Sequence, residues 1–157
     1  MAGHGPHAST PWTTNAIKQL KLVIPGGVIT WYIGVWEEFW RTVSGYNGSL
    51  ARTGALTAGG LGLATIALFI YILFIPITTG EEPDYRAWRQ SPVLSSVIPT
   101  LTTTIVLGWL VALIVFGQWS SLGYIKGFIG VSAAYALTFG LLGLLPAPKA
   151  KPKTRQA

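Results

Sequence analysis

Few side chains in this sequence could act as catalytic groups or as ligands of a cofactor. The histidines are His4 and His7, the one methionine is Met1, and there is no cysteine. Haem ligation draws on His, Met, Cys or Tyr, while disulfides, thiolate catalysis and Cys-ligated zinc all need cysteine. We therefore expect no catalytic residues and no cofactor bound by the chain's own ligands.

One metal site can be assembled at the N-terminus. If Met1 is removed, the chain begins Ala2-Gly3-His4. A free amine, two amide nitrogens and an imidazole at the third position can form a square-planar copper(II) or nickel(II) site. The alternative is a polar tail whose histidines contact water or a neighbouring chain.

The acidic residues do not form a general acid–base pair. Glu37 and Glu38 are adjacent in sequence, and adjacent residues on a helix point in different directions. They mark the point where a hydrophobic segment leaves the bilayer, or they pair with basic residues of another chain. The remaining acidic residues lie close to arginines in a loop that we expect to neutralise itself: Glu81, Glu82, Asp84, Arg86 and Arg89. The chain is predicted not to be an enzyme, although it could be a non-catalytic subunit of one.

The composition indicates an integral membrane protein. Of 157 residues, 50% are hydrophobic and 10% are charged, and the mean hydropathy is +0.50. Soluble domains carry about 25% charged residues, so an ordinary soluble enzyme is excluded. The net charge of +6 is typical of lysines and arginines at membrane edges, and we expect no nucleic-acid partner.

Three long apolar runs predict transmembrane helices, at about 54–79, 97–117 and 123–145. Roughly twenty residues at ~1.5 Å each cross a hydrocarbon core of about 30 Å. The segment 22–40 is less clear, because its uncharged part is short and its end is acidic and aromatic. It is either a helix lying in the interface or a fourth span. The predicted fold is an all-α bundle of three or four transmembrane helices.

The basic residues favour four spans. With both termini on the cytoplasmic side, four spans leave only Arg41, Arg52 and Lys126 on the opposite side, whereas three spans divide the basic residues almost evenly. Because cytoplasmic loops are enriched in Lys and Arg, we expect both ends of the chain on the cytoplasmic side of the membrane. The membrane is expected to be an energy-transducing one, such as the bacterial inner membrane. The predicted organisation is a polar tail (1–17), a membrane domain (18–146) and a basic tail (147–157).

Small residues recur at helical spacing in two of the predicted spans. Such spacing lets helix backbones approach closely in a bilayer. The helices concerned could pack on each other or on a larger partner subunit. The residues are Gly54, Ala58 and Gly62 in the first span, and Gly123, Gly127, Gly130 and Ala134 in the third.

Tryptophans, threonines and the basic tail complete the candidate contact residues. Five tryptophans are predicted to anchor the protein at the membrane interfaces, although stacking on a pigment, quinone or lipid is an alternative: Trp31, Trp36, Trp40, Trp88 and Trp119. The run Thr102, Thr103 and Thr104 is expected to hydrogen-bond to its own backbone. The C-terminal tail is predicted to contact anionic lipid or an acidic partner surface through Lys149, Lys151, Lys153 and Arg155.

One resemblance follows from the acidic loop. The sequence Glu81-Glu82-Pro83-Asp84-Tyr85 is followed by Ser91-Pro92, a second proline and a hairpin of helices containing glycine and tryptophan. This pattern, which covers roughly the second half of the chain, resembles the small four-span subunit IV of actinobacterial-type haem–copper oxidases. The N-terminal Pro-Gly-Gly segment departs from that pattern. The resemblance implies membership of a bioenergetic complex.

Together these features predict a non-catalytic accessory or assembly subunit of a larger membrane complex. A respiratory or photosynthetic electron-transfer complex is the expected setting, with larger membrane subunits and lipids as partners. The main alternative is a small homo-oligomeric channel or transporter, for which the threonine run offers the one polar stripe. A membrane-bound enzyme or enzyme anchor is a third possibility, and it would need ionisable groups that converge at one interface.

Overall fold

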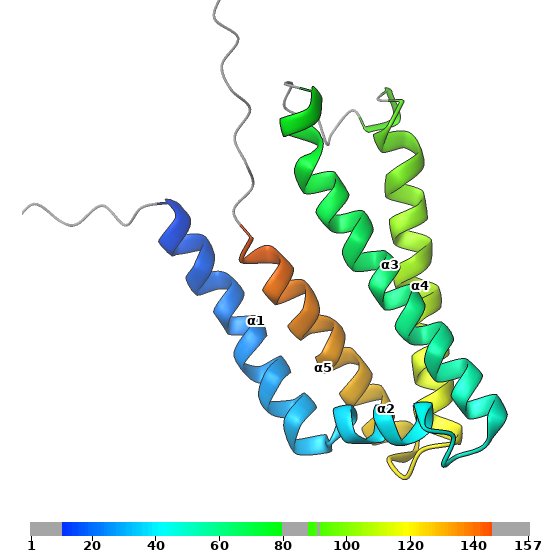
Figure 1. The fold of residues 1–157 in the computed structure, drawn as a ribbon. Helices are drawn as coiled ribbons and strands as arrows, with labels where there is room; N and C mark the ends of the chain where they lie inside the picture. The colour runs from blue at the N-terminus through cyan, green and yellow to red at the C-terminus, as the bar shows by residue number, and fades with distance from the viewer. Residues whose placement is uncertain (1–10, 80–87, 91, 146–157) are drawn as a thin grey trace, which may run out of the picture.

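The computed structural model describes residues 11–79, 88–90 and 92–145 (Figure 1). Within these ranges every regular element is a helix, so the all-α prediction is confirmed. The elements are α1 (Pro11–Ile33), α2 (Val35–Val43), α3 (Ser49–Thr79), a short 3-10 helix η1 (Trp88–Gln90), α4 (Leu94–Gln118) and α5 (Gly123–Gly143).

Three of these helices are long and apolar enough to cross a membrane. They are α3 over Ser49–Pro76, α4 over Leu94–Gln118 and α5 over Gly123–Gly143. They correspond to the three predicted spans, although α3 and α4 begin a few residues earlier than expected. The fold is therefore that of a multi-pass membrane protein.

The segment 22–40 is divided between two elements. Gly34, with a φ of 72°, occupies the left-handed region that glycine adopts without steric cost. Its amide donates to the carbonyl of Trp31, and its own carbonyl accepts from the amide of Glu38. Helix α1 therefore ends before this glycine, and the chain turns sharply into α2, which lies across the end of the bundle (Figure 1). Neither predicted alternative, one interfacial helix or one span, describes the whole segment.

Helix α1 lies antiparallel along α5 (Figure 1). A Cβ added to Gly26 would lie 3.0 Å from the backbone oxygen of Ala133. Farther along, a Cβ on Gly140 would lie 2.6 Å from Cγ2 of Val23. The two helices are therefore closely packed over several turns.

The other long contacts join α3 to α4 and α4 to α5. A Cβ on Gly54 would lie 2.6 Å from Cγ2 of Val115, which places α3 tightly against α4. Helix α5 also lies close to α4, because a Cβ on Gly127 would be 3.3 Å from the carbonyl carbon of Phe116. The long helices therefore follow one another side by side in the order α1, α5, α4, α3.

The two described chain ends lie at the same end of the bundle (Figure 1). The start of α1 and the end of α5 are neighbours there, as shown by Gln19, whose side-chain amide would meet a Cβ on Gly143 at 2.6 Å. Helix α2 and the connection between α4 and α5 lie at the opposite end. This arrangement places α2 where it can close one end of the bundle.

Candidate functional site

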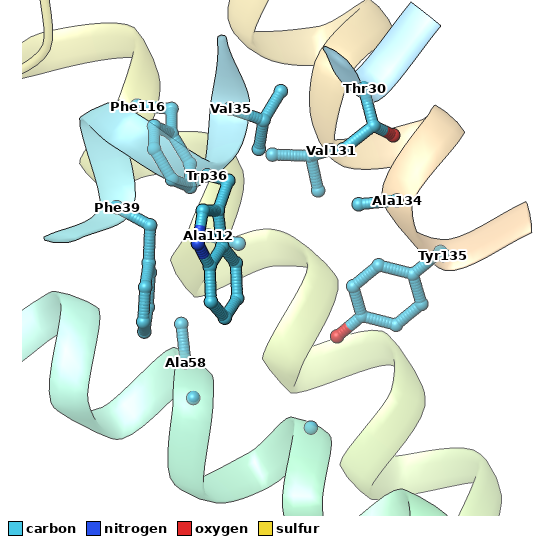
Figure 2. Close-up of a pocket in the computed structure, with 12 residues that line it drawn as sticks. Thr30, Val35, Trp36, Phe39, Ala58, Ala112, Phe116, Val131, Ala134 and Tyr135 are labelled. Atoms are coloured by element: carbon cyan, nitrogen blue, oxygen red, sulfur yellow. The ribbon is translucent and has the colours of Figure 1, made fainter. Parts of the chain in front are cut away.

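All the long helices contribute residues to a central apolar cavity (Figure 2). Its volume is about 220 Å³, which exceeds an engineered cavity of ~150 Å³ that binds benzene. The lining residues are Thr30 of α1, Val35, Trp36 and Phe39 of α2, Ala58, Gly59 and Gly62 of α3, Ala112 and Phe116 of α4, and Val131, Ala134 and Tyr135 of α5.

Small side chains on the three apolar helices create this space. Gly62 has no atom within 4 Å of the position where its Cβ would be, so α3 leaves this part of the cavity unfilled. Phe39 of α2 fills another part, with its ring 3.2 Å from a Cβ placed on Gly59. A buried cluster that includes Val35, Phe116 and Val131 forms a further part of the lining.

The polar groups of the lining are turned to the protein. The hydroxyl of Thr30 donates to the carbonyl of Gly26 at 2.7 Å. The hydroxyl of Tyr135 would lie 2.5 Å from a Cβ on Gly108, so it is directed against α4. The accessible lining is apolar. The cavity can therefore accept an alkyl or aromatic group by packing, and its walls offer no acid–base pair.

Helix α2 is amphipathic and contributes part of the cavity lining. Val35, Glu38 and Thr42 are buried, whereas Trp40 is exposed and Trp36, although it lines the cavity, is also largely exposed. The rings of Trp36 and Trp40 meet edge to face with centroids 5.6 Å apart. Exposed indoles on a helix that lies across the end of the bundle are typical of a membrane interface.

Glu38 holds α2 in place. Its Oε1 accepts a hydrogen bond of 3.0 Å from the amide of Ser121, in the connection between α4 and α5. Its Oε2 lies 3.7 Å from a guanidinium nitrogen of Arg41. The sequence left open a partner on another chain or a simple boundary role for this residue. The structure instead shows Glu38 joining two parts of the same chain, while Glu37 is exposed.

This role of Glu38 was missed at the level of sequence. The three-residue spacing of Glu38 and Arg41 is a visible signal of an ion pair on a helix. The contact with Ser121 joins residues 83 positions apart, and no local pattern indicates such a contact.

The predicted small residues fall into three groups. Gly54, Gly127 and Gly130 lie at close contacts between helices of this chain. Ala58 and Ala134 line the cavity, as does Gly62. A Cβ on Gly123 would meet no atom within 4 Å, and the residue adopts a φ of 68° at the start of α5, so its role within the chain is conformational. Sequence reasoning missed Gly26 and Gly108, which lie at two of the closest contacts.

Most of the predicted interface tryptophans are exposed. Trp31 is 89% exposed, and Trp36 and Trp40 are also exposed, whereas Trp119 is half-buried beside α3, with its ring 4.0 Å from a Cβ on Gly54. Trp88 begins η1.

The threonine prediction is confirmed. The hydroxyls of Thr102, Thr103 and Thr104 donate to backbone carbonyls three or four residues earlier in α4. Threonine hydroxyls satisfied in this way are compatible with a lipid-facing helix surface.

Several predicted residues lie outside the described ranges. They include the copper or nickel motif at Ala2, Gly3 and His4, the basic tail residues Lys149, Lys151, Lys153 and Arg155, and the acidic loop motif at 81–85. In the part of the chain that the structure describes, no group of three or more His, Cys, Asp or Glu side chains is placed to hold a metal ion.

No protein-family model matches the chain, and comparisons with curated proteins and with solved structures also return no match. The class of the protein is therefore defined by its own fold. The chain is a small multi-pass α-helical membrane protein with an apolar cavity that is lined in part by an amphipathic helix.

Proposed function

We propose that this protein is a non-catalytic accessory or assembly subunit of a larger membrane complex. The observation that carries the proposal is a stripe of small residues on the outer face of α3. The stripe, which we call the α3 outer face, consists of Thr53, Thr57, Gly60, Ala64 and Ala67. Spacings of four and three residues keep its members on one side of the helix.

The α3 outer face is not used by the described part of this chain. A Cβ on Gly60 would meet no atom within 4 Å, and contacts of α3 with α4 are made by other residues, such as Gly54 and Leu61. The hydroxyls of Thr53 and Thr57 donate to their own helix backbone. Small residues allow close helix packing that lipid contact does not require, which supports a partner helix at this face.

An energy-transducing complex, respiratory or photosynthetic, is the setting that we propose. The support comes from the sequence, through the resemblance of the acidic loop and the following hairpin to a small oxidase subunit. We also propose α1 as a fourth span, because it pairs with α5 over several turns. With four spans, both termini would lie on the cytoplasmic side of the membrane, for which we propose a bacterial inner membrane. The basic tail could there contact anionic lipid or an acidic partner.

Co-purification tests the proposal. Membranes are extracted in a mild detergent, separated on a native gel, and the co-migrating proteins are identified by mass spectrometry. Gly60→Leu adds a bulky side chain where the chain itself has space, so the variant should fold and extract normally but leave the complex. Thr102→Leu, on an exposed part of α4, is the matched control and should remain in the complex.

Two outcomes would contradict the proposal. In one, Gly60→Leu remains in a large complex at the yield of the unaltered protein. In the other, the unaltered protein migrates alone or as a small homo-oligomer. The channel or transporter alternative would then lead, and flux measurements in liposomes would be the next experiment.

A further inference from the structure

A groove between α1 and α5, near the end closed by α2, has a different chemical character from the central cavity. Its volume is about 440 Å³, within the range of ~300–1,000 Å³ that is common for small-molecule sites. One wall is formed by α1 and the other by the start of α5 with the residue before it. The groove therefore lies on the flank of a helix that is long and apolar enough to cross a membrane.

The walls of the groove are mainly apolar. Val28, Ile29 and Ile33 line it from α1, and Leu122 and Ile129 line it from the other side. Val28 and Ile129 are exposed in the chain, so the groove is open along its length and an alkyl chain can enter from the side. Branched side chains of this kind provide a dry surface for a hydrocarbon chain.

Two polar side chains complete the lining, Lys126 and Tyr32. Lys126 is exposed in the first turn of α5, and the carboxylate that forms an ion pair at this end, that of Glu38, is engaged with Arg41. Tyr32 is 88% exposed at the end of α1. An ammonium group and a phenol beside an apolar groove at the end of a spanning helix suit a phosphate group attached to hydrocarbon chains.

We propose that this groove binds one anionic phospholipid. An acyl chain lies against Val28, Ile29 and Ile129, and the phosphate is bound by the ammonium of Lys126 with the hydroxyl of Tyr32 as a second donor. Charge complementarity favours an anionic lipid over a zwitterionic one, because the lysine has no carboxylate partner in the described ranges. The central cavity has no such charge at its walls, so it offers a lipid no headgroup contact.

Native mass spectrometry of the full-length protein in detergent tests the proposal. Phosphatidylglycerol or phosphatidylcholine is titrated, and the population of protein with one bound lipid is measured. A cation near a membrane surface contributes ~1 kcal/mol to the binding of anionic lipid, so Lys126→Ala should weaken phosphatidylglycerol binding about fivefold. Phosphatidylcholine binding should be unchanged, and Lys126→Arg should retain the preference for phosphatidylglycerol.

Two further variants separate the site from general surface charge. Lys18→Ala removes an exposed cation on α1 outside the groove lining, and should leave binding unchanged. Ile129→Trp fills the groove while keeping Lys126, and should weaken the binding of both lipids. Soluble glycerol phosphate carries the charge without hydrocarbon chains and should not displace the lipid.

The proposal is wrong if Lys126→Ala binds phosphatidylglycerol as well as the unaltered protein does. It is also wrong if Lys18→Ala weakens binding to the same extent as Lys126→Ala, since the effect would then be a general electrostatic attraction. Displacement by glycerol phosphate would contradict the role of the apolar walls.

Discussion

The α1–α5 contact and the α3 outer face use the same kind of residue in opposite ways. At the contact, Gly26 lies so close to α5 that an added Cβ would be 3.0 Å from the backbone of Ala133. On the α3 outer face, a Cβ added to Gly60 would meet no atom within 4 Å. The spacing of small residues thus identifies a helix that can pack closely against another helix. The burial of each small residue then shows whether that second helix belongs to this chain.

The largest effect is expected at the α1–α5 contact. Gly26→Leu would force a side chain against the backbone of α5, which cannot move aside as a flexible side chain can. Overpacking of this kind costs ~1–3 kcal/mol or more, and we expect a clear loss of thermal stability in detergent, measured by unfolding monitored with tryptophan fluorescence.

The neighbouring glycine provides the matched control for that variant. A Cβ on Gly27 would lie 3.8 Å from a side-chain carbon of Leu137, an ordinary contact. Gly27→Ala should therefore leave the unfolding temperature nearly unchanged, as should Gly60→Ala on the α3 outer face. If Gly26→Leu is as stable as these controls, the close contact between α1 and α5 is not part of the folded protein.

An intermediate effect is expected where α2 is attached to the bundle. Glu38→Ala would remove the hydrogen bond that the carboxylate accepts from the amide of Ser121, and an intramolecular hydrogen bond contributes ~0.5–1.5 kcal/mol net. We expect reduced stability and faster proteolysis between α1 and α3. Glu37 is exposed, so Glu37→Ala should be neutral, and equal behaviour of the two variants would refute the attachment.

The smallest effect is expected between α3 and α4. The hydroxyl oxygens of Thr65 and Thr104 lie 3.3 Å apart, and Thr65 is buried. Hydrogen bonds between membrane helices contribute ~0.6 kcal/mol on average, so Thr65→Val should lower stability slightly. Thr102→Val, on an exposed part of α4, is the control, and its unfolding temperature should match that of the unaltered protein.

The sequence is sufficient to predict the three helices that are long and apolar enough to cross a membrane, because a continuous apolar run satisfies its backbone in a bilayer as a helix. It is not sufficient for the segment 22–40, where a single glycine at 34 ends one helix and starts another. The attachment of Glu38 to Ser121 depends on residues far apart in the chain. The cavity likewise depends on which faces of several helices meet, and periodicity within one helix does not specify that.

The central claim, that the α3 outer face receives a partner helix, is tested most directly by cross-linking in native membranes. The chain has no cysteine, so Ala64→Cys on this face and Val106→Cys on an exposed part of α4 each carry a single attachment point for a photoreactive maleimide. The account predicts a discrete adduct with a different, larger membrane protein from Ala64→Cys and lipid adducts alone from Val106→Cys. The same products from both positions, or an adduct with the mass of a homodimer, would contradict it.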